Sequence, residues 1–223
     1  PIFNKHAMSG MAHGNAGIIA ALAVLVETYQ DEQSIRLLQQ AWDFEDSLFE
    51  PAHQHWADLR NHIQASHSHQ CASNTSWCYG AAGIGLSRWR IYHTSSSTDI
   101  KNKALRDMRR AVEVILANPA EDNLSLCHGE VGNTQYLLCA QSLFQEDRIQ
   151  QRISSNIQNW IHAFHQEQIY CGHSTLAIEH SLMNGLSGIA YGLLNTHQPN
   201  SLPQVLALAG IPPPPVGIKT AQE

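Results

Sequence analysis

Two kinds of apolar pattern alternate along the chain. In residues 100–115 and 149–164, apolar side chains recur at intervals of three and four, so each segment presents one apolar face of a helix. Residues 16–26 and the segment around 136–140 are apolar nearly all round, which is typical of a helix buried on most sides. The sequence therefore predicts outer helices of the first kind, inner helices of the second kind, and few strands.

The inner-helix segments are preceded by a repeated motif. The motif is Gly-x-x-Gly followed by small apolar residues, and its four first glycines are Gly14, Gly80, Gly129 and Gly185. Such internal repeats indicate one structural unit used several times, and the intervals are long enough for a helical hairpin. If the hairpins stack side by side, the motif ends of all inner helices meet at one rim. We therefore expect the side chains just before the glycines to converge.

Residues that favour helix ends agree with this division. The candidate N-caps are Thr98 or Asp99 and Asp147, and the prolines at expected helix ends are Pro51 and Pro119. The run of four prolines at 212–215 cannot continue a helix.

The composition excludes several classes of protein. A chain of 223 residues with 43% apolar residues can build a core, so disorder is excluded as a class. A net charge of −6 without a basic run disfavours nucleic-acid binding. The longest apolar stretch, 16–26, is far shorter than the roughly 20 residues that span a bilayer, and no secretory signal stands at the start. Five cysteines, an odd number, favour a reducing compartment, and we expect a cytoplasmic protein.

Two cysteines and a histidine are the candidate metal ligands. Cys78 and Cys127 each stand two residues before the first glycine of a motif, and His128 follows Cys127. Two thiolates and one imidazole suit Zn²⁺, and three protein ligands leave a fourth position open, as in catalytic zinc sites. A helix N-terminus also favours the thiolate. The alternative is a pair of buried structural thiols beside a core histidine, because 49 residues separate the two cysteines.

His13 and Tyr79 are the candidate catalytic residues, one position before the glycine of their motifs. A histidine facing a metal could act as a general acid or base, and Tyr79 could donate a hydrogen bond into the cavity. Each also has a simpler explanation: His13 could be a core histidine, and Tyr79 could be an aromatic residue that only packs. A third group, His67, His69 and Cys71, has metal-binding spacing but lies in a polar stretch, which we interpret as a solvated loop.

Three ordered segments carry a resemblance to a known family. They read Ser-Gly-Met-Ala-His-Gly at 9–14, Trp-Cys-Tyr-Gly at 77–80 and Leu-Cys-His-Gly-Glu-Val-Gly at 126–132. These segments resemble the signature motifs of the lanthionine synthetase cyclases, the LanC-like family. Further segments are similar to the C-terminal cyclase domain of the class II (LanM-type) lanthipeptide synthetases in particular: 44–49, 56–60 and 182–194.

The resemblance implies an all-α fold, an α/α toroid of seven inner and seven outer helices. About four of the seven hairpins would lie in residues 1–208, as the C-terminal part of a cyclase domain, followed by a Pro-rich tail at 209–223. The chain would be a fragment, and because one wall of the ring would stay open, the fragment alone could be inactive.

The resemblance also implies a reaction. Zn²⁺ would be held by Cys78, Cys127 and His128. The thiolate of a cysteine in a dehydrated precursor peptide would add to dehydroalanine or dehydrobutyrine, which forms the lanthionine or methyllanthionine thioether ring of a lantibiotic. His13 matches the residue that protonates the resulting enolate. The implied partners are the precursor peptide and an upstream dehydratase domain of the same polypeptide.

Three positions depart from the family's usual pattern. Ala82 replaces a usual proline, Glu130 stands where Asp is frequent, and Asn74 stands where some single-domain cyclases carry an arginine. The first two changes are tolerable, and no role is assigned to Asn74. Three alternatives to a cyclase remain open: a non-catalytic LanC-like module that binds a peptide or glutathione, a zinc prenyltransferase, and a structural fragment without zinc.

Overall fold

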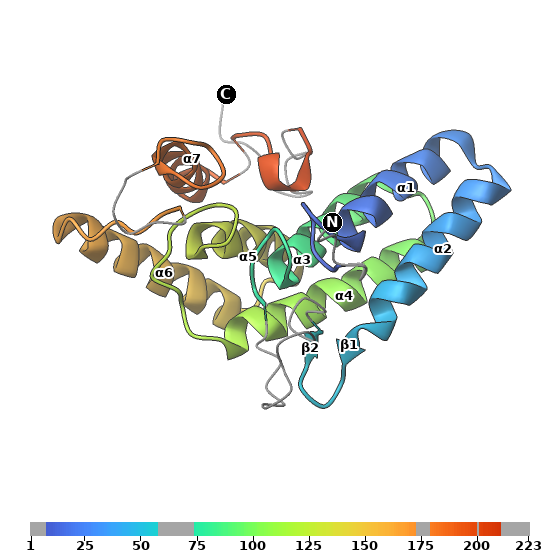
Figure 1. Cartoon of the computed structure of the whole chain (residues 1–223), viewed down its shortest axis with the longest axis horizontal. Helices are drawn as coiled ribbons and strands as arrows, with labels where there is room; N and C mark the ends of the chain where they lie inside the picture. The colour runs from blue at the N-terminus through green and yellow to red at the C-terminus, as the bar shows by residue number, and fades with distance from the viewer. Residues whose placement is uncertain (1–7, 58–73, 173–178, 200, 211–223) are drawn as a thin grey trace, which may run out of the picture.

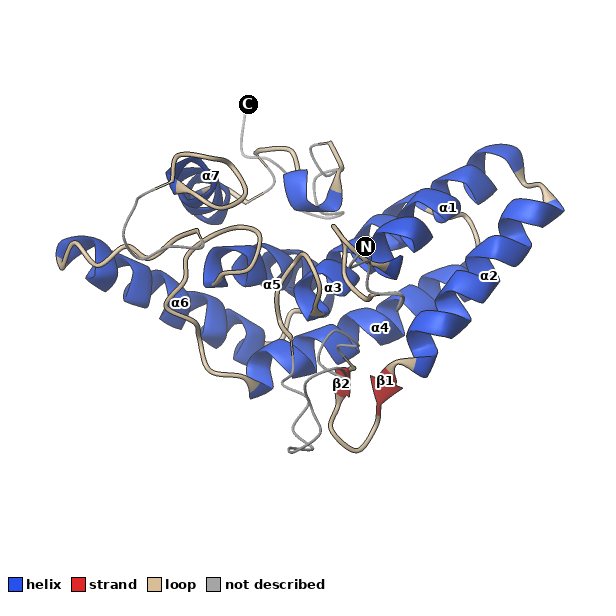
Figure 2. Ribbon diagram, in the orientation of Figure 1, coloured by secondary structure: helices blue, strands red, loops and turns tan. Residues whose placement is uncertain are grey.

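The computed structural model describes residues 8–57, 74–172, 179–199 and 201–210, and within these ranges the chain is almost entirely helical (Figure 2). Four helices begin directly after the first glycine of a repeat motif: α1 (Asn15–Tyr29), α3 (Ala81–Thr94), α5 (Glu130–Phe144) and α7 (Leu186–His197). Three further helices lie between them along the chain: α2 (Glu32–Ser47), α4 (Thr98–Ala117) and α6 (Asp147–His165).

The helices form two rows. Helices α1, α3, α5 and α7 contact one another in that order, and α2, α4 and α6 each pack against the inner helix that precedes them in the chain (Figure 1). This is the inner and outer arrangement of an α/α toroid, which confirms the predicted fold class. Three hairpins are complete in the described residues. The fourth inner helix, α7, is followed there by a short 3₁₀ helix, Val205–Ala207, rather than by an outer helix.

Burial explains the two sequence patterns. The inner helix α5 is covered on most sides, and residues as different in position as Val131, Tyr136 and Ala140 have no exposed surface. The outer helix α6 buries one stripe, which includes Ile149 and Ile153, and leaves its other faces in water. The pattern that is apolar nearly all round therefore marks helices with neighbours on several sides, as predicted.

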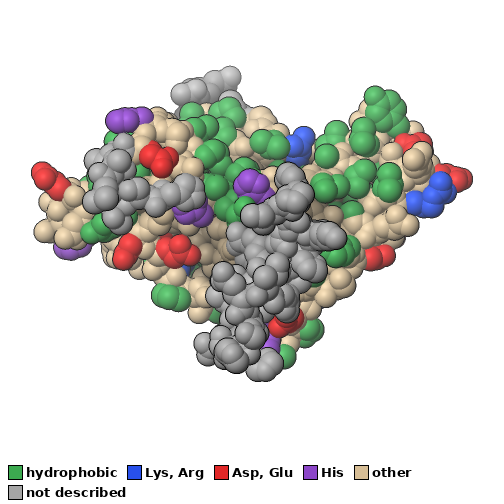
Figure 3. All heavy atoms as spheres, viewed as in Figure 1, with side chains coloured by type: hydrophobic (Ala, Val, Ile, Leu, Met, Phe, Trp, Pro, Cys, Tyr) green, Lys and Arg blue, Asp and Glu red, His purple; other side chains and the backbone are tan. Residues whose placement is uncertain are grey.

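Helix α1 stands at the end of the inner row in the described part of the chain, where it packs against α2 and α3. Its sequence is as apolar as that of the other inner helices, yet Ile18, Leu25 and Tyr29 are 56%, 42% and 70% exposed. Figure 3 shows hydrophobic side chains gathered over this end of the molecule, at the upper right of the view.

The helix ends differ slightly from the prediction. Ser97, not Thr98 or Asp99, is the N-cap of α4, and its hydroxyl accepts a hydrogen bond from the amide of Ile100 at 3.4 Å. The prediction was wrong because the chain offers several adjacent capping residues and the backbone geometry selects one of them.

The other predicted N-cap was also wrong by one residue. Asp147 is the first residue of α6, and Glu146 is its N-cap. Asp147 is nevertheless well placed, because a carboxylate in the first turn is favoured by the helix dipole. Helices α2 and α4 end shortly before Pro51 and Pro119, as predicted.

A small β-hairpin follows α2. Strands β1 (Phe49–Glu50) and β2 (His55–Trp56) are antiparallel, with Phe49 opposite Trp56, and their two aromatic rings meet edge to face at 5.0 Å. Strand β2 contacts α4, so the hairpin closes the lower edge of the α2–α4 region in Figure 1.

A buried ionic cluster ties α2, α3 and α4 together. Arg88 on α3 pairs with Glu45 on α2 and with Asp107 on α4 at 3.1 Å, and all three side chains are at most 1% exposed. The indole of Trp42 donates to Asp107 at 2.8 Å. Burial alone would raise the pKa of Asp107, but Arg88 and Arg106 outweigh it and hold that pKa below its usual value. Burial raises the pKa of Glu45.

Candidate metal centre

All four motif turns are closed by the same backbone hydrogen bond. The amide of the residue after the first glycine donates to the carbonyl oxygen six residues before that glycine. The four bonds are Asn15 to Met8 (2.6 Å), Ala81 to Asn74 (2.9 Å), Glu130 to Asn123 (2.8 Å) and Leu186 to Glu179 (2.9 Å). Each inner helix therefore begins from an equivalent loop, which places corresponding residues of the motifs at corresponding points in space.

This loop explains why the motif needs glycine. In the second motif, a Cβ on Gly80 would overlap the carbonyl oxygen of Asn74, and a Cβ on Gly83 would overlap that of Trp77. Gly80 has a φ of −128°, which any residue adopts, so the requirement comes from close backbone approach and not from backbone conformation. The same overlaps recur at the corresponding glycines of the other motifs.

The motif turns are bonded to one another in a ladder. The amide of His13 donates to the carbonyl of Cys78 at 3.4 Å, the amide of Cys78 donates to that of Cys127 at 3.2 Å, and the amide of Cys127 donates to that of Met183 at 2.9 Å. Segments far apart in the sequence thus lie side by side at one rim of the inner row. The expected convergence of the motif ends is confirmed by these bonds.

The ladder brings the predicted metal ligands together. The sulfur atoms of Cys78 and Cys127 and a ring nitrogen of His128 lie within 4.8 Å of one another. Cys78 is only 4% exposed, whereas Cys127 and His128 are half-buried. The cluster is therefore walled on one side by protein and reachable from the other.

The opposite pKa shifts of the two cysteines favour a single proton held between their sulfur atoms. A hydrogen bond from the Cys127 thiol is the main influence that lowers the pKa of Cys78, to about 6, against the opposing effect of burial. The same hydrogen bond raises the pKa of Cys127. The hydroxyl of Ser76, 3.5 Å from the Cys78 sulfur, and the nearby His128 also favour the Cys78 thiolate. A metal that replaces the shared proton would meet one thiolate already formed.

His128 is held by two hydrogen bonds that leave its ring directed toward the cysteines. Its Nε2–H donates to the carbonyl oxygen of Gly172 at 3.3 Å, and its amide donates to the hydroxyl of Ser125 at 3.3 Å. A carbonyl oxygen can only accept, so Nε2 carries a proton in this bond. Outer contacts of this kind are what fix the tautomer and orientation of metal-binding histidines.

The structure places His13 and Tyr79 beside this cluster. The His13 imidazole stacks on the Tyr79 ring, with centroids 4.7 Å apart and planes at 18°. His13 is exposed, and Tyr79 is half-buried with its carbonyl oxygen accepting from the Ser9 hydroxyl at 2.9 Å. His13 is therefore not the core histidine of the simpler explanation. Its backbone is bonded to Cys78, since the His13 amide donates to the Cys78 carbonyl at 3.4 Å.

The sequence analysis missed the residues that shape the turns. The side-chain oxygen of Asn74 accepts from the amide of Ser76 at 2.9 Å, and that of Asn123 accepts from the amide of Ser125 at 2.8 Å. In both motifs the asparagine stands six residues before the first glycine and the serine stands four residues before it. The repeated Asn-x-Ser pattern could therefore have predicted these turns. Asn74, to which no role was assigned, is thus a turn-forming residue.

The side chain of Glu130 connects the third motif turn to α6 and to the preceding loop. Its buried carboxylate accepts from Asn156 at 2.6 Å and from the amide of Glu121 at 3.3 Å, and it pairs with Arg152 at 3.2 Å. Glutamate at this position, noted as a departure from the family pattern, therefore reaches partners on α6 and in the loop before the motif.

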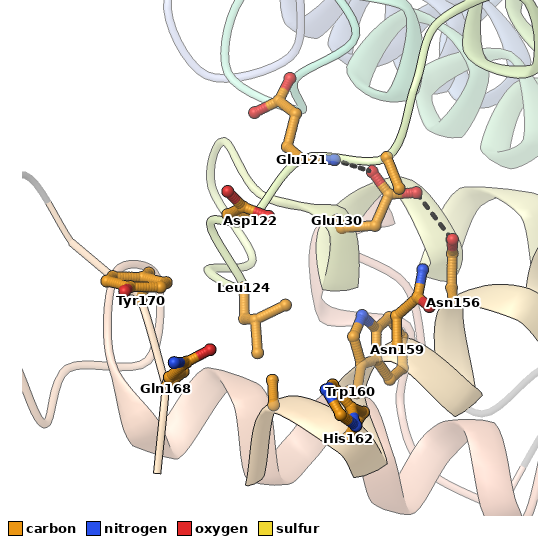
Figure 4. A pocket seen from close by; sticks show the side chains of 12 residues that line it. Glu121, Asp122, Leu124, Glu130, Asn156, Asn159, Trp160, His162, Gln168 and Tyr170 are labelled. Carbon is orange, nitrogen blue, oxygen red and sulfur yellow. Dashed lines mark hydrogen bonds between the residues drawn. The ribbon is translucent and has the colours of Figure 1, made fainter. Parts of the chain in front are cut away.

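A polar pocket of about 250 Å³ lies beside the third motif. Figure 4 shows Glu121 and Glu130 on one side of it and Trp160 and His162 of α6 on the other. Burial raises the pKa of Glu121, although the hydroxyl of Thr75 donates to its carboxylate at 3.3 Å. Arg152 offsets the charge of Glu130, so this side of the pocket is polar and its two carboxyl groups differ in their partners.

The structure says less about the other features noted in the sequence. His67, His69 and Cys71 lie outside the described residues. The described cysteines are all free thiols: Cys78, Cys127, Cys139 and Cys171. In the described part of the chain, no helix combines the length and the apolarity that crossing a bilayer requires.

The chain is similar to proteins of lantibiotic biosynthesis. It is 27% identical over 198 residues to the lacticin 481/lactococcin biosynthesis protein LcnDR2 of Lactococcus lactis subsp. lactis, a match that covers 85% of this chain. The chain spans only 20% of that relative's length. Among solved structures, nisin cyclase matches with a TM-score of 0.63 at 18% identity, over 91% of this chain and 50% of the nisin cyclase chain. That likeness establishes the fold.

The family is established by a match over nearly the whole chain. Residues 2–207 match the family described as "Lanthionine synthetase C-like protein". The match includes the motif turns, the helices that they begin and the residues of the candidate metal centre. The chain therefore belongs to the lanthionine synthetase C-like family.

Proposed function

We propose that the protein is the C-terminal part of a zinc-dependent cyclase domain that forms lanthionine or methyllanthionine thioether rings, most similar to that of a class II synthetase. The observation that carries this proposal is the meeting of Cys78, Cys127 and His128 within 4.8 Å. The three residues come from two motif turns, so their meeting depends on the fold rather than on local sequence.

The donor set fits zinc. Two sulfur atoms and one imidazole nitrogen are ligands that Zn²⁺ prefers, and a set of three protein ligands leaves room for one more. Zinc bound by Cys78, Cys127 and His128 would supply the chemistry of a Lewis acid that keeps an incoming peptide cysteine as thiolate, the nucleophilic form. The hydrogen bond from His128 to Gly172 would keep the imidazole in the ligating orientation.

His13 is the proposed general acid. When a thiolate adds to the β-carbon of dehydroalanine or dehydrobutyrine, a carbon–sulfur bond forms and the carbon–carbon double bond becomes an enolate. Ring closure is complete once the α-carbon takes up a proton. His13 is exposed and stacks on Tyr79 beside Cys78, and histidine is the side chain used most often as a general acid or base. Tyr79 fixes the His13 ring by stacking and could donate a hydrogen bond to the substrate.

The proposed substrate is a dehydrated lantibiotic precursor peptide. The name of the relative LcnDR2 places it in lacticin 481/lactococcin biosynthesis, and that protein is about five times as long as the region matched. We propose that a dehydratase domain of the same polypeptide supplies the dehydrated peptide. The free thiols at the centre fit a reducing compartment, which favours the cytoplasm.

Metal analysis tests the proposal. We expect the purified protein to bind zinc at this centre and expect Cys78→Ala and Cys127→Ala to lose that zinc, because each removes one of three ligands. Cys139→Ala is the matched control, since Cys139 is a buried free thiol of α5 outside the cluster. Undiminished zinc at the centre in both ligand variants would reject the assignment.

Ring formation is tested in the longer protein that contains the domain. Cyclisation does not change the mass of a peptide, so the free cysteines of a dehydrated peptide are counted by thiol alkylation and mass spectrometry. The proposal expects alkylation to fall with time in the unchanged protein and to persist in Cys78→Ala. Peptide binding without loss of free thiols would instead identify a binding module.

A further inference from the structure

We propose a second divalent-metal site on the β-hairpin, formed by Glu50, His53 and His55. One side-chain oxygen of Glu50 and one ring nitrogen of each histidine lie within 4.8 Å of one another. The site shares no residue with the sulfur-containing centre and lies at the lower edge of the molecule in Figure 1, on the chain segment between α2 and the second motif.

The hairpin turn gathers the three side chains. Glu50 ends β1, His55 begins β2 and pairs with Glu50 across the two strands, and His53 lies in the turn between them. The Nδ1 atom of His53 lies 3.0 Å from the carboxylate of Glu50, and the two imidazole rings stack with centroids 5.7 Å apart and planes at 17°. The three groups therefore meet without any movement of the backbone.

His55 supplies an independent sign of a missing ligand. The residue is only 5% exposed, and its Nδ1 atom is buried without a hydrogen-bond partner among the described residues. A buried polar nitrogen without a partner is costly and calls for an explanation, of which an ion is one. Because only 5% of His55 is exposed, solvent cannot easily supply the missing partner.

The donor set differs in kind from that of the sulfur-containing centre. Two imidazoles and one carboxylate suit Zn²⁺ and other divalent ions that imidazole favours, such as Co²⁺ and Ni²⁺. The side chains of His53 and Glu50 are 64% and 40% exposed, so the ion can enter from solvent. Since the ligands come from both strands and the turn, a bound ion would tie the hairpin together and hold it against α4.

Cobalt titration of the purified protein tests the site. Co²⁺ bound by cysteine gives a thiolate-to-metal charge-transfer absorption, whereas Co²⁺ bound by Glu50, His53 and His55 does not. We expect two equivalents of Co²⁺ in the unchanged protein. The double variant Cys78→Ala/Cys127→Ala should lose the charge-transfer band and keep one equivalent, and His53→Gln should keep the band and lose one equivalent.

Two further variants sharpen the test. His53 is exposed, so His53→Gln should fold. The charge-transfer band of the sulfur-containing centre checks that this variant is folded. Glu50→Gln should weaken binding at the hairpin at least tenfold. The double variant His162→Gln/His165→Gln, which removes two exposed histidines of α6 outside the cluster, should keep both equivalents.

The outcomes separate the two metal sites. Unchanged metal content in His53→Gln, or no bound metal in the double cysteine variant, would overturn the hairpin site and leave the zinc proposal intact. Absence of the charge-transfer band in the unchanged protein, with one equivalent still lost in His53→Gln, would reject the cyclase centre and support the hairpin site.

Discussion

The imidazole of His13 stacks on the ring of Tyr79, with their centroids 4.7 Å apart. The two residues belong to neighbouring motifs and hold equivalent positions, one before the first glycine. The hydrogen bond from the His13 amide to the Cys78 carbonyl fixes the backbone that carries this pair. The proposed proton donor is therefore carried by the same ladder that brings the two sulfur atoms together.

Replacing His13 tests its proposed role. In the longer protein that contains the domain, His13→Gln should slow ring formation by about 10²–10⁴, the range attributed to general acid–base catalysis, and should leave the zinc content unchanged. His162→Gln, which makes the same change at an exposed histidine of α6, is the matched control. Equal cyclisation rates in His13→Gln and the unchanged protein would remove His13 from the mechanism.

The shared proton of Cys78 and Cys127 predicts an unusual titration. Because its hydrogen bond with Cys127 lowers the pKa of Cys78 to about 6, the metal-free protein should gain one thiolate as the pH rises through about 6. Cys127, whose pKa is raised, should stay protonated there. Ultraviolet absorption of the thiolate measures the titration. In Cys127→Ala the midpoint should move up, and a midpoint that stays near 6 would contradict the shared proton.

The close approach of the motif loop predicts a local effect of adding a methyl group. Gly83→Ala would push a Cβ into the carbonyl of Trp77, and we expect a loss of about 1–3 kcal/mol in the free energy of unfolding. Metal affinity should fall as well, because Cys78 follows Trp77. Gly210→Ala is the control, since nothing lies within 4 Å of its added Cβ. Denaturant unfolding and metal titration provide the two readouts, and equal values for both variants would contradict the prediction.

The buried ionic cluster predicts a strong dependence on Arg88. Arg88→Met would leave the carboxylates of Glu45 and Asp107 buried without their shared cation, which typically costs about 3–5 kcal/mol. Arg36→Ala removes an exposed pair with Glu32 and should cost less than about 1 kcal/mol. Thermal unfolding compares the two. A similar melting temperature for both variants would show that the cluster does not stabilise the fold.

Much of the fold could be predicted because the inner and outer helices differ in pattern. The segments 16–26, 100–115 and 149–164 all fall inside observed helices. The sequence analysis made no helix prediction for Glu32–Ser47 and did not foresee the β-hairpin. Strands of two residues are too short to show an alternating pattern, and only tertiary contacts stabilise them.

The meeting of the three candidate ligands was predicted, but the way in which the fold brings them together was not. The register shared by Cys78 and Cys127 was visible in the sequence, and the equivalent loops explain why that register is also spatial. The partners of His128 were not visible, because Gly172 lies 44 residues away and contributes a backbone carbonyl that no side-chain pattern reveals. The group on the hairpin was missed for a related reason, since its geometry depends on strand pairing.

The ladder of motif turns has a consequence for how the molecule matures. Cys78 and Cys127 belong to different hairpins, and neither hairpin alone can offer more than part of the ligand set. Contacts between such distant segments form late relative to local helices. A growing chain would therefore bind zinc at this centre with all three ligands only after α5 had packed against α3. Zinc occupancy would report that these two parts of the fold had come together.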